Sequence, residues 1–294
     1  MTLSVVIPYY NNENLLMENI DSLFKALKKA SYSYEIIIVD DYSNVGDVNS
    51  ITREYSEYPI KIIKNIHNVG FSKTANKGIK AAVGELVFLL NTDIKLDEEC
   101  LVGIADEFKD DNLFGVGLRQ IILEGNKKID NKPCKAKFSY GMLRRTYYVG
   151  GGAGIFDRRK LVELGIFDTI FSPFYYEDAD LSYRALKKGW RIVLDRDRKV
   201  EHRHETTINR SYPKLFIKCV AQRNWVLFNW KNLDSKNLIK HLLWLPINIV
   251  RELAVGNFSF ILGLCWATIY LPRVLTTRSR QTFIRTDKQI LNES

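Results

Sequence analysis

The sequence lacks the cysteine patterns of zinc and redox sites. Its four cysteines lie far apart, at positions 100, 134, 219 and 265, and no two of them form a Cys-x-x-Cys pair. Scattered cysteines of this kind indicate a reducing compartment rather than a disulfide framework. The N-terminus also lacks a basic segment and a long apolar run, so we expect no secretory signal.

Acidic residues are fewer than basic ones, and recognisable nucleic-acid-binding motifs are lacking. The counts of 34 and 43 give a net charge of +9, which suits nucleic acid, an anionic membrane or a phosphorylated substrate. No basic run exceeds three residues, so we expect no nucleic-acid partner. The 294 residues, 46% hydrophobic and 26% charged, predict a globular protein with one large domain or a domain and an appendage.

A glycine-rich loop is missing after the first apolar stretch, residues 3–7, where the sequence reads Pro8-Tyr9-Tyr10-Asn11. Dinucleotide-binding folds and nucleotidyltransferases hold phosphates with such a loop at this place, so the sequence disfavours both. The glycines gather instead at residues 150–154, where they indicate either close approach of the backbone to a ligand or a flexible turn.

Short apolar runs alternate with helical patterns over the first hundred residues. The runs are residues 3–7, 34–39, 60–64 and 85–90, and the helical patterns are residues 15–30, 48–58 and 71–82. Continuously apolar strands separated by helices predict an α/β fold with a mostly parallel central sheet buried on both faces.

Polar residues follow two of these predicted strands. Asp40 and Asp41 come after the second, and Asn91 and Asp93 after the fourth. Ligands of such sheets bind beyond the carboxyl ends of the strands, so these side chains are candidates for one binding rim. The alternative is that they are ordinary turn residues.

Three carboxylates, Glu177, Asp178 and Asp180, occupy four positions before a predicted helix. Mutual repulsion and partial burial raise a carboxylate pKa, which suits a general base near neutral pH. The alternative is a helix N-terminus, where acidic residues complement the helix dipole. Weaker candidates are His202 and His204, two residues apart, for a metal, and Arg144, Arg145 and Arg223 for a diphosphate.

The order of these segments resembles that of the family 2 glycosyltransferases, over roughly residues 3–230. The similar segments are Ser4-Val-Val-Ile-Pro8-Tyr-Tyr-Asn11, Val39-Asp40-Asp41-Tyr-Ser43, Asn68-Val-Gly70-Phe71 with Asn76-x-Gly78, Asn91-Thr92-Asp93, Gly151-Gly152 with Phe156-x-Arg158, Glu177-Asp178-x-Asp180-Leu181 and Val200-x-His202. The resemblance implies a GT-A fold for a nucleotide-diphospho-sugar transferase, of a rhamnosyltransferase-like type that adds a single sugar. Gln222-Arg223-Asn224-Trp225 resembles the Gln-x-x-Arg-Trp motif of processive synthases, but its spacing differs.

The resemblance also implies roles for individual residues. Asp178 would be the catalytic base of a single displacement with inversion. Mg²⁺ or Mn²⁺ would be bound by Asp93 and His202, although His204 competes for this role and Asn91 replaces the first acidic residue of the metal motif. The implied donor-binding residues are Pro8, Tyr10, Asp40, Asp41, Asn76, Asn91 and Asp93. The implied acceptor-binding residues are Gly151, Gly152, Glu177 and Asp180.

The chain ends in an apolar region that differs from the rest. Twenty uncharged residues lie between Glu252 and Arg273, with basic residues on both sides. We therefore predict a GT-A catalytic domain over residues 1–212 and a helical, membrane-associating extension over residues 213–294, lying at the interface or as a re-entrant hairpin. The alternatives are a core helix pair and a dimer interface.

The expected function is a metal-dependent hexosyl- or deoxyhexosyltransferase of cell-surface polysaccharide synthesis. It would use a UDP- or dTDP-sugar and a glycan or polyprenyl-linked acceptor, in the cytoplasm, peripherally on the inner face of the membrane. The alternatives are a nucleotidyltransferase that makes sugar nucleotides and a non-catalytic glycan- or nucleotide-binding module. The second would be marked by loss of a base or metal residue, yet both Asp178 and Asp93 are present.

Overall fold

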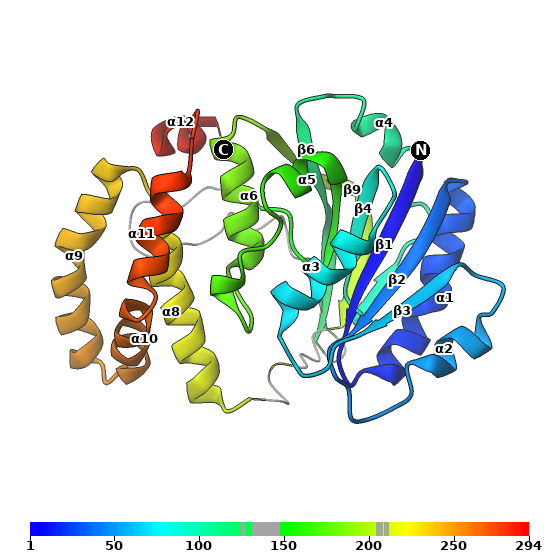
Figure 1. Cartoon of the computed structure of the whole chain (residues 1–294), viewed down its shortest axis with the longest axis horizontal. Helices are drawn as coiled ribbons and strands as arrows, with labels where there is room; N and C mark the ends of the chain where they lie inside the picture. Colours follow the sequence, from blue (N-terminus) through cyan, green and yellow to red (C-terminus); the bar gives the residue numbers. More distant parts are fainter. Residues whose placement is uncertain (125–126, 131–147, 204–207, 209–211, 294) are drawn as a thin grey trace.

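The computed structural model describes residues 1–124, 127–130, 148–203, 208 and 212–293. Within these residues the chain forms a nine-stranded sheet with helices on both faces, followed by a group of helices at one side (Figure 1). His204, Arg144 and Arg145 lie outside the described residues, so their predicted roles are not addressed by the structure.

The first half of the sheet is parallel, in the order β3-β2-β1-β4. Its strands are β1 (Thr2–Tyr9), β2 (Ser33–Asp40), β3 (Ile60–Lys64) and β4 (Leu86–Leu90). Alternate residues of a strand point to opposite faces, and both faces are buried here: Val5 packs in one core cluster and Val6 in the other. β1 and β2 run downward from the N-terminus in Figure 1, so their carboxyl ends lie at the lower edge of the sheet.

The second half of the sheet is mixed. It continues as β4-β8-β6-β9-β5, with β7 paired to β6. These strands are β5 (Ile94–Leu96), β6 (Leu113–Glu124), β7 (Lys127–Asp130), β8 (Ala153–Asp157) and β9 (Arg191–Arg203). β8 is antiparallel to β4 and β6, whereas β6 and β9 are parallel. β9 extends through the polar residues 195–199, where no apolar run in the sequence marks a strand.

Helices cover both faces of the sheet. On one face, α1 (Glu13–Ala30), α2 (Asn49–Glu54) and α4 (Ile104–Glu107) contribute Leu16, Ile20 and Ile104, among others, to one core. On the other face, α3 (Phe71–Ala81), α5 (Arg158–Glu163) and α6 (Glu177–Lys187) contribute Ile79, Leu161 and Leu181. The apolar spacing of the predicted helices at residues 15–30 and 71–82 therefore corresponds to the buried faces of α1 and α3.

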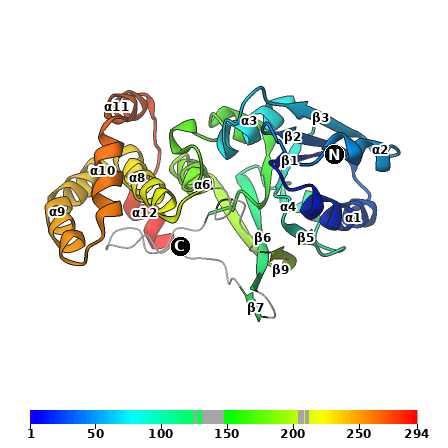
Figure 2. The same ribbon diagram turned by 90° about the horizontal axis from the view of Figure 1, so that it is seen from below.

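The C-terminal helices pack beyond α6, on the side away from β3 (Figures 1 and 2). They are α8 (Lys214–Asn232), α9 (Ser235–Ala254), α10 (Phe258–Thr268), α11 (Leu271–Arg280) and α12 (Asp287–Glu293). Together with α6 and the short helix η1 (Thr169–Phe171) they enclose a third core, which includes Phe171, Tyr183 and Phe228. α8 contacts α6, α9, α10 and α11. The boundary at residues 212/213 stays a prediction.

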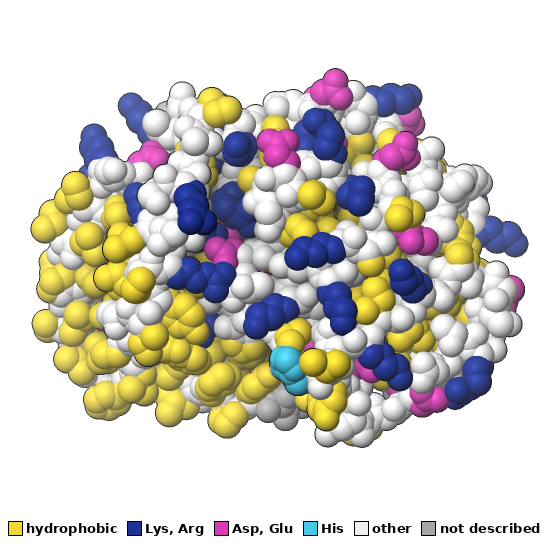
Figure 3. Space-filling model, in the orientation of Figure 1, with side chains coloured by type: hydrophobic (Ala, Val, Ile, Leu, Met, Phe, Trp, Pro, Cys, Tyr) yellow, Lys and Arg dark blue, Asp and Glu magenta, His cyan; other side chains and the backbone are white. Residues whose placement is uncertain are grey.

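The C-terminal helices expose a large apolar face. Trp244 is 56% exposed and Leu243 71% exposed, and the exposed set continues through Ile247, Val250, Leu253, Phe258, Leu262 and Ile269. In Figure 3 hydrophobic side chains gather at the lower left, over the region of α9 and α10. Among the described residues no single helix combines the length and hydropathy of a membrane span, whereas α10 and α11 do so as a pair bent by 63°.

Candidate active site

A pocket of about 380 Å³ lies beyond the carboxyl ends of β1 and β4. The predicted site residues that line it are Pro8, Tyr10, Asp41, Asn91, Asp93, Gly151, Gly152, Glu177, Asp178 and His202. Tyr148, Phe174, Tyr175 and Tyr212 add aromatic walls. Parallel strands bring their carboxyl ends to one edge of the sheet, and predicted site residues from six separate segments of the chain meet here.

Asp93 and His202 form a pair on one side of the pocket. β5 and β9 are paired so that Ile94 lies opposite His202, which sets the His202 ring beside the neighbouring Asp93. His202 Nε2 lies 3.1 Å from Asp93 Oδ2, and His202 Nδ1 lies 3.0 Å from Gln120 Oε1. A proton on Nδ1 that is donated to Gln120 leaves the Nε2 lone pair available for a metal.

The pair fits a hard divalent cation with an incomplete protein shell. Asp93 Oδ1 is buried without a hydrogen-bond partner, and a carboxylate and an imidazole both suit Mn²⁺ or Mg²⁺. Among the residues that the structure describes, no cluster of three or more histidine, cysteine, aspartate or glutamate side chains could hold a metal. A cation at Asp93 and His202 would thus need substrate phosphate oxygens and water to complete its coordination.

Glu177 and Asp178 lie at the N-terminus of α6, also in the pocket wall. Asp178 Oδ1 accepts a hydrogen bond from the Ala179 amide at 2.7 Å, and Oδ2 accepts one from the Gly151 amide at 3.4 Å. Burial raises the pKa of Asp178 despite these bonds. Burial and the charge of Asp178 raise the pKa of Glu177 well above its usual range, and Glu177 Oε2 has no hydrogen-bond partner.

The predicted Gly151-Gly152 segment connects the two sides of the pocket. The Asn91 amide donates to the Gly152 carbonyl at 2.9 Å. A Cβ on Gly152 would lie 3.1 Å from Asn91 Nδ2, and one on Gly151 would lie 3.2 Å from the ring of Phe71. The glycines therefore let the backbone pass close to both Asn91 and Phe71.

Asp40 and Asp41, adjacent in sequence, differ in position. Asp41 lines the pocket, with Oδ1 accepting from the Val69 amide and Oδ2 from the Gly70 amide, both at 2.9 Å. The side chain of Asp40 lies outside the pocket and accepts a hydrogen bond from the Ser43 amide at 2.9 Å. The Oδ1 atom of its carboxylate therefore holds a turn, and the donor-binding role of Asp40 stays a prediction.

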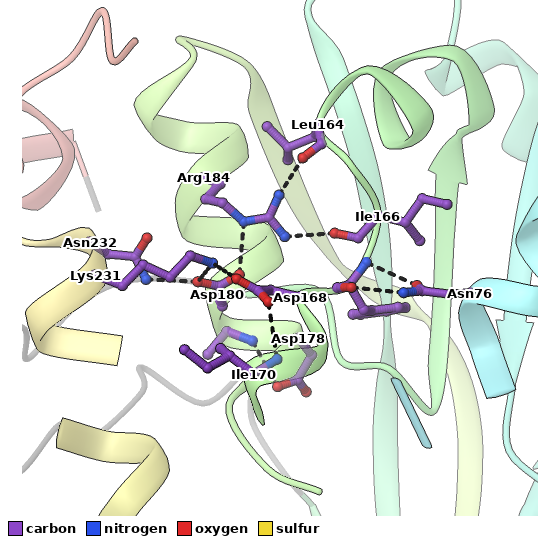
Figure 4. Close-up of polar contacts among 12 residues, drawn as sticks. Asn76, Leu164, Ile166, Asp168, Ile170, Asp178, Asp180, Arg184, Lys231 and Asn232 are labelled. Carbon is purple, nitrogen blue, oxygen red and sulfur yellow. Dashed lines mark hydrogen bonds and ion pairs between the residues drawn. The ribbon is translucent and has the colours of Figure 1, made fainter. Parts of the chain in front are cut away.

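Asn76 also has a structural place. Its side chain donates to the Phe167 carbonyl at 2.8 Å and accepts from the Phe167 amide at 3.0 Å (Figure 4). This reciprocal pair ties α3 to the segment before η1. Asn76 is not among the residues that line the pocket, and its contact with the donor stays a prediction.

Asp180 is fully buried and points away from the pocket into an ion-pair network (Figure 4). Oδ2 accepts from Arg184 Nε at 2.8 Å, and Oδ1 accepts from Lys231 Nζ at 2.7 Å and Asn232 Nδ2 at 2.8 Å. Lys231 also pairs with Asp168 at 2.8 Å. With both oxygens occupied by groups of the chain itself, Asp180 joins α6 to α8, and its predicted acceptor-binding role is corrected.

Arg223, a predicted diphosphate contact, is likewise 1% exposed and absent from the pocket wall. It donates to the carbonyl of Ser172 and to the side chain of Asn224. Its role is therefore structural, within the interface between α8 and the segment before α6.

The family model described as "Glycosyl transferase family 2" matches residues 4–160, more than half of the chain. The chain belongs to glycosyltransferase family 2. The match spans Asp93 and Gly151-Gly152 but ends before Glu177 and His202, which the structure adds to the same pocket.

Known relatives of this family 2 chain include a dolichol-phosphate mannosyltransferase of Pyrococcus furiosus, 29% identical over 139 residues. The match covers 47% of this chain and 38% of the relative, so the chain spans well under half of the relative's length.

Solved structures confirm the GT-A fold. GalNAc-T7, solved with UDP, GalNAc and Mn²⁺, has a TM-score of 0.62 at 17% identity, covering 80% of this chain and 48% of that one. TarS of S. aureus, residues 1–349 with UDP-GlcNAc, has a TM-score of 0.58 at 20% identity, covering 82% and 72%. The predicted sheet flanked by helices with a C-terminal helical extension is thus confirmed, with a sheet that is mixed in its second half.

Several residues in and around the site were not predicted, among them Gln120, Asn224, Tyr148 and Tyr212. Gln120 contacts His202 only because β6 and β9 are paired, and no local pattern in the sequence signals this pairing. Asn224 lies within the motif-like segment at residues 222–225, which pointed to a different role. Its contacts with the segment before α6 appear only in the folded chain.

Proposed function

We propose that the chain is an inverting glycosyltransferase of cell-surface polysaccharide synthesis. It would move a hexosyl or deoxyhexosyl group from a UDP- or dTDP-sugar to a hydroxyl group of a glycan or polyprenyl-linked acceptor. One observation carries the proposal: the Asp93–His202 pair and the Glu177–Asp178 pair line a single pocket. Retention of both pairs favours catalysis over a non-catalytic binding module.

The donor side of the proposed site contains Pro8, Tyr10, Asp41 and Asn91 beside Asp93. Asp93 and His202 would hold Mg²⁺ or Mn²⁺ together with oxygens of the donor diphosphate, and Gln120 would keep the His202 ring oriented. When bound, the cation would supply positive charge next to the departing diphosphate.

The acceptor side contains the proposed base. Asp178 would take the proton of the acceptor hydroxyl while its oxygen attacks the anomeric carbon and the bond from that carbon to the diphosphate breaks. A single displacement inverts the configuration. Burial, which raises the pKa of Asp178, brings the base nearer to a working pH around neutral. Glu177, Gly151 and Gly152 would border the acceptor.

A peripheral position on the inner face of the cytoplasmic membrane is part of the proposal. The apolar face of α9 and α10 is exposed around Leu243, Trp244 and Phe258. An interfacial helix buries such a face at the boundary of headgroups and acyl chains. The relative named a dolichol-phosphate mannosyltransferase supports a polyprenyl-linked acceptor, which would be presented at that surface.

A donor screen tests the proposal. Thermal unfolding would be followed with UDP-, dTDP- and GDP-sugars in the presence and absence of Mn²⁺, because a ligand that binds the folded state raises its stability. We expect a UDP- or dTDP-sugar to raise the melting temperature with Mn²⁺ and to release its nucleoside diphosphate on turnover. The proposal fails if no nucleotide sugar stabilises the protein and no diphosphate is released.

A further inference from the structure

The segment at residues 171–176, called here the catalytic turn, carries part of the aromatic wall of the pocket and leads into Glu177 and Asp178. Phe174 and Tyr175 line the pocket. Tyr175 and Tyr176 have φ angles of +71° and +74°, in the left-handed region that non-glycine residues seldom occupy. Two consecutive residues in this conformation persist only where surrounding contacts determine it.

One side chain of α8 makes several of the contacts that fix this backbone conformation. Asn224 is fully buried, and its Nδ2 lies 2.7 Å from the carbonyl oxygen of Phe171, 2.8 Å from that of Phe174 and 2.9 Å from that of Tyr175. One amide group thus donates hydrogen bonds to three carbonyl oxygens of the catalytic turn. An amide offers two protons, so one of them is shared between two acceptors.

Arg223 fixes the direction of the Asn224 amide. Arg223 Nε donates to Asn224 Oδ1 at 2.9 Å, which turns Nδ2 toward the carbonyls, and its Nη2 donates to the Ser172 carbonyl. The guanidinium lies 4.2 Å from the centre of the Trp266 ring and 5.5 Å from that of Tyr270. The two aromatic faces cover the cation while leaving its N–H edge for these bonds.

We propose that Asn224, oriented by Arg223, is a positioning residue for Asp178. It holds the catalytic turn in the conformation that sets Asp178 and the aromatic wall at the pocket. The opposite edge of the turn contacts the N-terminus of α3, where the Phe71 amide donates to the Pro173 carbonyl at 3.3 Å. The role of Asp178 as the base rests on the proposed function. The way in which Asn224 holds the catalytic turn rests on the observed contacts.

The decisive variant is Asn224→Asp, which keeps the shape of the side chain. It replaces the donating amide with an oxygen that faces three carbonyl oxygens, so the turn must rearrange. The matched control is Asn229→Asp on the same helix. Asn229 is also buried, but its Nδ2 donates to the Trp225 carbonyl of its own helix at 2.7 Å.

We expect Asn224→Asp to lower kcat by about 10–100-fold, as small misplacements of a reacting group do, and to shift the acid limb of the pH–rate profile. Affinity for UDP with Mn²⁺ should stay near that of the wild type, because Asp93 and His202 belong to other elements. Asn229→Asp should leave kcat and the pH profile unchanged. Asn224→Ala, which lacks the repulsion, should give a smaller loss in the same direction if the Asp variant does not fold.

Hydrogen exchange of the amides at residues 171–180 provides a readout independent of turnover. Faster exchange there in Asn224→Ala, with unchanged exchange in β1 and β4, supports the positioning role. Wild-type kcat and pH profile in the Asn224 variants would overturn it. Slow exchange in a wild type that transfers no sugar would instead contradict the proposed function and leave the contacts of Asn224 intact.

Discussion

At the scale of single residues, the site contains two neighbouring carboxyl groups whose environments disfavour charge. Glu177 is buried and Asp178 partly buried at the N-terminus of α6, and loss of solvation raises the pKa of both. Only Asp178 accepts hydrogen bonds from two amides, those of Gly151 and Ala179. This difference makes Asp178 the better candidate for the base.

The substitution Asp178→Asn tests the base directly. The amide has nearly the same shape but cannot take a proton, and general base catalysis contributes about 10²–10⁴-fold. We expect transfer to fall by that factor while binding of nucleotide sugar with Mn²⁺ is retained. Initial rates and donor affinity measure the two effects, with the exposed Asp197→Asn as control. Comparable turnover in Asp178→Asn would remove this residue from the mechanism.

Stability measurements test Glu177. Because its pKa is raised above the ordinary value of 4.5, the folded state binds the proton more tightly than the unfolded state. The free energy of unfolding then falls as pH rises from the ordinary pKa to the raised pKa of the folded state, by about 1.4 kcal/mol for each unit by which the pKa is raised. Glu177→Gln resembles the neutral form, so it should be more stable than the wild type at pH 8 and lose this advantage near pH 4.5. Urea unfolding of the wild type and of Glu177→Gln across this pH range measures the difference in stability. A difference that does not change with pH would contradict the raised pKa of Glu177.

Substitution of Asp93 tests its proposed metal role. Asp93→Ala should weaken binding of the cation and of the donor diphosphate together, because one carboxylate would hold both through the ion. Calorimetric titration with UDP in the presence and absence of Mn²⁺ measures the two affinities. Asp97→Ala, at an exposed position four residues on, is the control. Full activity of the wild type in excess EDTA would exclude the role proposed for Asp93 and His202.

At the scale of elements, α8 and α6 are joined by a buried cation shared between two carboxylates. Lys231 is 1% exposed and contacts Asp168 and Asp180. Burial alone would raise the pKa of Asp168, but Lys231, the Ile170 amide and Arg273 outweigh it and lower the pKa to about 2. The stabilisation from Asp168 is therefore complete above its ordinary value of 3.8 and is lost only as pH falls toward about 2.

We expect Lys231→Met to destabilise the protein by about 3 kcal/mol, because it removes the lysine that two buried carboxylates share, although Asp180 keeps Arg184 and Asp168 keeps Arg273. The loss should be smaller at acid pH than at pH 8, because a buried carboxylate that has lost the lysine binds a proton more readily in the folded state. Urea unfolding measures it, and Lys236→Met, at an exposed position of α9, should cost less than about 0.5 kcal/mol. Equal stabilities of the two variants would show that the network contributes little.

At the scale of the whole molecule, the apolar face of α9 and α10 lies at the opposite side from β3 (Figures 1 and 3). Several basic residues near the tail are engaged within the protein: Lys231 is buried, and Arg278 donates to the backbone carbonyls of Trp230 and Leu233. Attachment to a membrane should thus depend more on apolar contact than on charge.

The double substitution Leu243→Glu and Trp244→Glu should abolish co-flotation with anionic phospholipid vesicles, which the wild type should show and high salt should weaken only in part. Ile66→Glu, at an 87% exposed apolar residue beside β3, is the matched control. A truncation before α9 would be less informative, because it also removes Asp287, a partner of Tyr183 and Asn237. Failure of the wild type to float, together with a dimer that the double substitution dissociates, would identify the face as a dimer interface.

The sequence by itself determined the secondary-structure elements of the first half of the sheet and the order of the site motifs along the chain. Strand and helix periodicity is a local property, so β1 to β4, α1 and α3 follow from the spacing of apolar residues. Asp93, Asp178 and His202 were predictable because their motifs are short and occur in the order of a known family. The convergence of strand ends at one edge was predictable from the parallel sheet alone.

Only the tertiary structure decided which polar side chains face the pocket and which hold the fold. Asp180 differs from Asp178 because its carboxylate accepts a hydrogen bond from Lys231, 51 residues away. Asn224 donates hydrogen bonds to carbonyls about 50 residues away. His202 meets Gln120 across 82 residues through the register of β6 and β9. Such contacts depend on how elements pack, and no local pattern of residue types contains that information.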